Sequence, residues 1–175
     1  MKIFLNKKNI LITGRPGIGK TSFILSLADQ LNQIKPAGFF TREIRKGGSR
    51  AGFSISTFDG FEKILAHQAL KSSIRVSKYG VDIKAIDQVI DHIMETSRSP
   101  DLWFIDEIGK MESFSEKFRN FINQILREKV SVIATIALHS TGWIEQIKKR
   151  PDIHLLELTE ANRNCFINEL EKALQ

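Results

Sequence analysis

The stretch from Gly14 to Thr21 constrains this chain more than any other, and it reads Gly-Arg-Pro-Gly-Ile-Gly-Lys-Thr. An apolar run over residues 10–12 precedes it, and residues 22–28 have apolar side chains at helical spacing. Glycines let the backbone wrap tightly, so that its N–H groups converge on an anion, and the start of the following helix adds partial positive charge. A strand, this loop and a helix in succession predict a phosphate-binding loop.

Two side chains of this loop have specific predicted roles. The Lys20 ammonium can reach the β- and γ-phosphates, and the Thr21 hydroxyl can ligate Mg²⁺. A glycine-rich turn that binds nothing is the alternative, and the Lys-Thr pair at this offset, with both flanks in place, argues against it. The predicted nucleotide-binding residues of the segment are Gly14, Arg15, Pro16, Gly17, Ile18, Gly19, Lys20, Thr21 and Ser22. The motif therefore indicates a nucleoside triphosphate without specifying the reaction.

Length and charge narrow the class of protein. A chain of 175 residues is enough for one domain with a sizeable core, so we expect a single domain over residues 1–175. The net charge of +6 suits anionic ligands and would also tolerate nucleic acid. We favour simple solubility as the explanation of this net charge, because the basic residues are scattered and lack the interleaved aromatic side chains of a single-strand-binding groove.

Other features of the composition exclude several kinds of site. The single cysteine, Cys165, leaves no intramolecular disulfide, which fits a reducing compartment. The first residues lack the apolar core of a signal peptide, and no apolar run approaches the length of a membrane span. We therefore expect a cytoplasmic protein that does not associate with membranes. The four histidines show no metal-ligand spacing, so a zinc site is not expected.

Apolar segments of strand and helix type alternate along the chain, which predicts an α/β fold with a mostly parallel sheet. Residues 38–44 and 51–58 flank a Lys-Gly-Gly-Ser turn and predict a β-hairpin, followed by a third strand over residues 61–66. This block is an antiparallel extension of the core sheet. The other strands are expected at 9–13, 102–105, 130–136 and 153–158, and helices at 20–33, 83–97, 114–127, 143–149 and 160–174.

Two acids, Asp106 and Glu107, follow the apolar run 102–105. Open α/β sheets bind ligands at the carboxyl ends of their strands, so both carboxylates should emerge beside the phosphate loop. Asp106 is suited to hold Mg²⁺ through water, and Glu107 is suited to polarise an attacking water as a base. An acidic pair that merely ends a strand in solvent would be the better explanation if the chain had no phosphate loop.

The second acid also favours water as the nucleophile, and no arginine-rich lid is apparent, which argues for hydrolysis over kinase activity. Arg42 and Arg163 could each contact phosphate in the role of an arginine finger, with a surface salt bridge as the equal alternative. The predicted catalytic residues are thus Glu107, Lys20, Arg42 and Arg163. By fold-level analogy, Thr135 could sense the γ-phosphate from a strand between the loop strand and the Asp106 strand.

These residues together resemble the THEP1-type nucleoside-triphosphatase family, which includes a human cancer-related member. The likeness covers nearly the whole chain and is carried by residues 12–21, 38–44, 47–53, 78–81, 105–112 and 159–164. The Asp-Glu-Ile-Gly-Lys-Met-Glu stretch at 106–112, combined with Thr-Arg-Glu in the hairpin, is far more specific than a phosphate loop alone. One departure is that many relatives have a histidine nearer to the threonine than His139 is to Thr135, which leaves any sensor role of these two residues open.

The resemblance implies hydrolysis of nucleoside triphosphates to the diphosphate and phosphate, with Mg²⁺ and broad base tolerance, so that ATP, GTP, CTP and UTP are implied substrates. It also implies a three-layer P-loop fold related to the RecA and AAA+ branch. By position, residues 14–21 would bind phosphates, Asp106 the metal and Glu107 the water. Arg42 and Arg163 both fall inside matching motifs.

Two alternative functions stay open at this point. A nucleotide or nucleoside kinase would use the second acid to position an acceptor hydroxyl. An ATP-switched module would instead bind RNA or a protein through its basic surface. The sequence has no signal for the preferred base, the physiological substrate or the oligomeric state.

Overall fold

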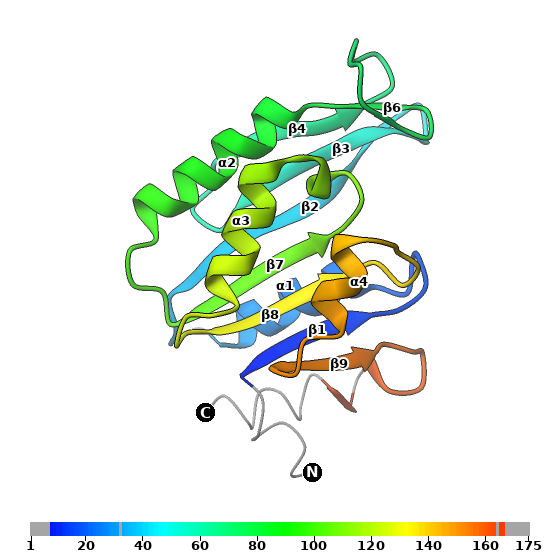
Figure 1. Cartoon of the computed structure of the whole chain (residues 1–175). Helices are drawn as coiled ribbons and strands as arrows, with labels where there is room; N and C mark the ends of the chain where they lie inside the picture. The colour runs from blue at the N-terminus through cyan, green and yellow to red at the C-terminus, as the bar shows by residue number, and fades with distance from the viewer. Residues whose placement is uncertain (1–7, 32, 164, 167–175) are drawn as a thin grey trace.

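The computed structural model describes residues 8–31, 33–163 and 165–166, and its strands form one sheet of nine strands (Figure 1). The strands are β1 (Asn9–Thr13), β2 (Pro36–Lys46), β3 (Ser49–Thr57), β4 (Glu62–His67), β5 (Arg75–Val76), β6 (Tyr79–Val81), β7 (Leu102–Ile108), β8 (Ser131–Ile136) and β9 (Ile153–Glu157). The helices are α1 (Lys20–Gln30), α2 (Ile83–Thr96), α3 (Glu116–Ile125) and α4 (Trp143–Lys148), with a 3-10 turn, η2, at Glu112–Phe114.

The central part of the sheet is parallel. Strand order is β5-β6-β4-β3-β2-β7-β8-β1-β9, and β2, β7, β8, β1 and β9 pair in parallel with their neighbours in that series. Strand β8 lies between β1, which leads into the phosphate loop, and β7, which carries the two acids. This order confirms the predicted place of the Thr135 strand, and it brings the carboxyl ends of three strands together at one edge.

The antiparallel extension is confirmed and is larger than predicted. Strand β2 pairs with β7 through residues 36–39 and with β3 through residues 39–46, so one long strand joins the parallel and antiparallel parts. Strand β4 adds to β3, and the short strands β6 and β5, which were not predicted, follow at the edge of the sheet. The hairpin is therefore a continuation of a strand of the central sheet, which also positions the phosphate loop.

Helices cover both faces of the sheet, which confirms the three-layer α/β fold. Figure 1 shows α2, α3 and α4 on one face and α1 on the other. Side chains alternate between the two faces along the central strands, as a period of two requires. In β7, Trp103 and Ile105 pack with the cluster under α2, α3 and α4, whereas Leu102 and Phe104 pack with Phe23 of α1.

Close packing of β2 against β7 depends on Gly38. This residue has φ +116°, and a Cβ at its position would lie 1.9 Å from the carbonyl oxygen of Phe104. A side chain is therefore excluded both by conformation and by space. The glycine lets β2 approach β7 just before the chain turns into the hairpin.

Some predicted boundaries were wrong. Helix α1 ends at Gln30, and β7 continues through Asp106 and Glu107 to Ile108, which pairs with Ile136 after an irregularity in register. The two acids therefore lie within a distorted strand end, not after it. Helix α3 begins at Glu116, because η2 occupies the preceding residues.

Most of the helix predicted over residues 160–174 lies outside the described residues. Of the helices that the structure describes, none has the combination of length and hydrophobicity that crossing a membrane requires.

Candidate active site

The phosphate loop joins β1 to α1 and leaves the start of the helix available to a ligand. Gly19 precedes α1 with φ +98°, and within the described structure no side chain caps the first N–H groups of the helix. Free amides and the positive end of the helix dipole at one point make an anion site. The Lys20 ammonium donates to the Gly14 carbonyl oxygen at 3.0 Å, so it already lies across the loop.

Asp106 is the centre of a hydrogen-bond network that joins the loop to the neighbouring strands. The Thr21 hydroxyl donates to Oδ2 of Asp106 at 2.7 Å, and the Thr135 hydroxyl donates to Oδ1 at 2.6 Å. The amide and hydroxyl of Thr41 approach Oδ2 at 3.5 and 3.4 Å. Asp106 is only 1% exposed. Helix α1 and strands β2, β7 and β8 thus meet at one carboxylate.

The residues at this point fit a hard divalent cation. Thr21 and Asp106 present a hydroxyl and a carboxylate oxygen next to the phosphate loop, and oxygen is the donor that Mg²⁺ prefers. Among the described residues, no cluster of three or more His, Cys, Asp or Glu side chains could hold a metal alone. A cation here would complete its shell with water and phosphate oxygens, as Mg²⁺ commonly does.

Glu107 lines the cavity that the phosphate loop borders. The cavity has a volume of about 590 Å³ and is also lined by Lys20 and Thr21. Burial raises the pKa of the Glu107 carboxyl, the positive charge of Lys20 opposes that rise, and the Asp106 carboxylate adds to it. A carboxyl with a raised pKa accepts a proton more readily near neutral pH, which suits a general base.

The hairpin forms the opposite wall of this cavity and brings Arg42 into it. Arg42 stacks over the Phe40 ring, with 4.7 Å between the guanidinium carbon and the ring centroid. Arg50 lines the same cavity and hydrogen-bonds the Glu43 carboxylate, which lowers the pKa of Glu43. Sequence reasoning did not assign a role to Arg50, although it lies in the hairpin segment 47–53 that carried the family resemblance.

Arg163 lies at a different place. It lines a separate, smaller hollow of about 310 Å³ along the phosphate loop, together with Arg15 and Glu160. Arg15, Pro16, Gly17 and Ile18 form the loop wall of this hollow. The structure therefore does not bring Arg163 and Arg42 into one cavity. His139 lines the cavity of Glu107, whereas Thr135 reaches that region through Asp106.

A further acid near the site, Glu112, was missed as a candidate. Glu112 is 5% exposed, and burial raises its pKa to about 8, with the charges of Glu107 and Asp106 adding to the rise. A Cβ at Gly109 would lie 2.8 Å from Oε2 of Glu112 and 3.3 Å from Oε1 of Glu107, so both carboxyls face Gly109. Its place at the end of the 106–112 motif was the available signal.

Comparison with known proteins agrees with this geometry. A profile of the family described as NTPase matches residues 9–171. The chain is 44% identical over 167 residues to the nucleoside-triphosphatase THEP1 of Thermotoga maritima, covering 95% of each chain. It is 31% identical to the human cancer-related nucleoside-triphosphatase, covering 96% of this chain and 97% of that protein.

Two solved structures share the fold. The crystal structure of THEP1 from the hyperthermophile Aquifex aeolicus superposes with a TM-score of 0.83 at 33% identity, covering 95% of this chain and 99% of that one. The solution structure of the human cancer-related nucleoside triphosphatase gives a TM-score of 0.81 at 29% identity, covering 96% and 97%. The chain therefore belongs to the THEP1-type family of nucleoside-triphosphatases.

Proposed function

We propose that this chain hydrolyses nucleoside triphosphates to the diphosphate and phosphate, with Mg²⁺ as cofactor, at the site formed by the phosphate loop, Asp106 and Glu107. Membership of the family makes it a nucleoside-triphosphatase. The observation that carries the proposal is the 2.7 Å contact between Thr21 and Asp106, which joins the loop to the acidic strand.

Binding and charge neutralisation are assigned to the loop. Its free amides and the Lys20 ammonium bind the β- and γ-phosphates, which places the γ-phosphate in the cavity that Glu107 lines. Thr21 and Asp106, the latter through water, would hold Mg²⁺, which when bound neutralises charge on the phosphate oxygens. Thr135 fixes the orientation of Asp106 by its 2.6 Å hydrogen bond, so it acts on this site indirectly.

Glu107 is assigned to the water. It orients a water molecule and accepts its proton as the water oxygen attacks the γ-phosphorus and the bond to the β-phosphate oxygen breaks. Of the two arginines that line this cavity, Arg50 is paired with Glu43, so Arg42 is the one that would stabilise the charge that develops on the γ-phosphate. Arg163, in the separate hollow that it lines with Arg15, is suited to hold the rest of the nucleotide.

A phosphate-release panel tests this function. We expect the protein to release phosphate from ATP, GTP, CTP and UTP with Mg²⁺, and to stop when the metal is removed by EDTA. Lys20→Ala, prepared alongside, should lose both nucleotide affinity and turnover. Transfer of the γ-phosphate to an added nucleoside or nucleotide, with no release in its absence, would show a kinase instead.

A further inference from the structure

The segment that follows β8, residues 137–140, lies between the phosphate loop and Glu107. Strand β8 is placed between β1, which leads into the loop, and β7, which carries Glu107, so the chain leaves the sheet between the two. Leu138 and His139 line the cavity in which the proposed function places the γ-phosphate. The backbone of this segment therefore borders the position at which the γ-phosphate would react.

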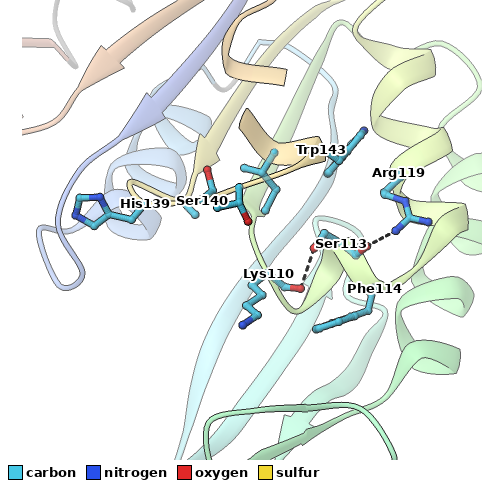
Figure 2. Close-up of a pocket in the computed structure, with 10 residues that line it drawn as sticks. Lys110, Ser113, Phe114, Arg119, His139, Ser140 and Trp143 are labelled. Carbon is cyan, nitrogen blue, oxygen red and sulfur yellow. Dashed lines mark hydrogen bonds between the residues drawn. The ribbon is translucent and has the colours of Figure 1, made fainter. Parts of the chain in front are cut away.

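Packing alone does not fix this segment, because hollows lie on both of its sides. A second cavity, of about 620 Å³, lies under α4, and Ala137 and His139 line both it and the cavity of the phosphate loop. Figure 2 shows His139 extending away from Trp143, the first residue of α4, on the side of the blue loop that follows β1. Specific hydrogen bonds are therefore needed to hold the backbone here.

Helix α4 supplies these hydrogen bonds from its last turn. The Lys148 ammonium donates to the Leu138 carbonyl oxygen at 2.9 Å and to Oε1 of Glu145 at 2.8 Å. The Ser140 hydroxyl donates to the same oxygen of Glu145 at 2.7 Å. The Lys148 side chain is only 9% exposed, so water competes little for its charged donor groups. The chain is thus held by α4 on both sides of His139.

The hydrogen bond from Lys148 also sets the direction of the next N–H group. The peptide bond between Leu138 and His139 is trans and planar, so its C=O and N–H groups point in opposite directions. Because the carbonyl is turned to Lys148, the His139 N–H points away from α4, and the phosphate-loop cavity lies on that side. None of the described residues accepts a hydrogen bond from this N–H. It is therefore a backbone donor that is available to a ligand.

We propose that the His139 N–H donates a hydrogen bond to the γ-phosphate, and that Lys148 is the positioning residue that orients it. Such a donor stabilises the negative charge on the γ-phosphate oxygens in the transition state, and it needs no reorganisation because it is already oriented. The inference rests on the proposed function, since it needs a nucleotide at the phosphate loop. It assigns the contact to the backbone amide of His139 and not to the imidazole.

Isotope labelling isolates this amide for a direct test. Leu138-His139 is the only Leu-His pair in the chain, so protein labelled with carbonyl-¹³C leucine and ¹⁵N histidine gives one signal in an HNCO spectrum. The proton of this amide should move downfield when the β,γ-imido analogue of ATP is added with Mg²⁺, because an anionic acceptor deshields it. ADP with Mg²⁺, which lacks the γ-phosphate, should not move it. A resonance that stays in place, or that moves equally with ADP, would overturn the proposal.

Variants separate the amide from the imidazole. His139→Ala keeps the N–H, so kcat should stay close to that of wild type. Lys148→Met keeps the length of the side chain but removes the donor to the Leu138 carbonyl. We expect it to lower kcat by about a hundredfold, the lower end of the loss for one oxyanion donor, with little change in KM. Lys148→Arg can still donate and should restore most of kcat, and Lys149→Met, at an exposed neighbour, is the control.

Two outcomes of these measurements would contradict the assignment. A loss of kcat in His139→Ala as large as that in Lys148→Met would assign the contact to the imidazole. A kcat of Lys148→Met equal to that of wild type would remove the positioning role. In folded Lys148→Met, the labelled amide should also no longer respond to the imido analogue.

The labelled amide of the wild-type chain keeps this proposal distinct from the proposed function, and it decides the contact even if Lys148→Met does not fold. A resonance that responds to the imido analogue, in a protein that releases no phosphate from ATP, would count against hydrolysis and support the contact. Phosphate release with a resonance that does not respond would support hydrolysis and overturn the contact.

Discussion

At the scale of single residues, three neighbouring carboxyl groups with different surroundings organise the site. Asp106 accepts hydrogen bonds from Thr21 and Thr135, which fix the orientation of both of its oxygens. Glu107 faces the cavity with a raised pKa, and Glu112 lies behind it with a pKa of about 8. Repulsion among three close carboxylates is reduced because Glu112 holds its proton at neutral pH.

The raised pKa of Glu112 predicts a pH-dependent stability. The folded chain holds the Glu112 proton up to a pKa of about 8, whereas the unfolded chain loses it near the ordinary pKa of a glutamate, 4.5. The stabilisation is therefore complete below the lower value and is lost as pH rises towards the upper one. Glu112→Gln removes this titration. Between pH 4.5 and about 8, the free energy of unfolding of the variant should therefore rise relative to that of wild type, by at most about 1.4 kcal/mol per pH unit.

Urea unfolding at pH 5 and pH 8 measures this difference. Glu95→Gln, which changes an exposed acid on α2, serves as the matched control and should show the same difference from wild type at both pH values. If Glu112→Gln also differs from wild type by a constant amount, Glu112 does not titrate in this window.

At the scale of elements, the long β2 strand has two functions along its length. Its first residues are part of the parallel sheet through β7, and its later residues pair with β3 and line the cavity that the phosphate loop borders. The hairpin thereby places Arg42 and Arg50 in the cavity that Glu107 lines, whereas Arg163 lines the separate hollow at the loop. The arginines of these two hollows should therefore contribute differently to turnover.

We expect Arg42→Ala to lower kcat by about a thousandfold, the lower end of the range for a transition-state arginine, with little change in KM. Arg163→Ala should mainly raise KM, because its hollow lies away from Glu107. Steady-state phosphate release separates the two parameters, and Arg98→Ala, an exposed arginine after α2, is the control. The same kcat loss in both variants would contradict this division.

The junction of β2 with β7 predicts a sharp requirement for glycine at position 38. Gly38→Ala would place a Cβ 1.9 Å from the Phe104 oxygen at φ +116°. We expect it to lower the free energy of unfolding by about 3 kcal/mol or more. Gly47→Ala, at φ +57° with nothing within 4 Å, should lower it by only about 1 kcal/mol. Equal losses in urea unfolding would show that the close approach is unimportant.

At the scale of the whole molecule, the parts that the sequence predicted are those that depend on local spacing. The Gly14–Thr21 loop, the hairpin and the acids after an apolar strand are short sequence patterns. Because open α/β sheets bind ligands at the carboxyl ends of their strands, the loop and the acids could also be expected to lie together. Arg50 and Glu112 lie in segments that carried the family resemblance, but the cavity that Arg50 lines and the burial of Glu112 depend on how distant segments pack. The continuation of β7 was missed for the same reason, since its last residue pairs with β8 across an irregular register.

The same edge of the sheet carries two adjoining cavities, one at the phosphate loop and one under α4. They share the segment that follows β8, so the order of the central strands determines where both lie. Hydrolysis at the first cavity is the central claim, and it depends on Glu107 acting on water while the phosphate loop binds the nucleotide.

Single-turnover phosphate release by Glu107→Gln, measured beside its nucleotide affinity, tests this claim most directly. The amide keeps the size of the side chain and removes the base, so we expect unchanged affinity and a rate lowered by about 10²–10⁴. Glu116→Gln, an exposed acid at the start of α3, should match wild type in both measurements. A rate near that of wild type in Glu107→Gln would contradict the account.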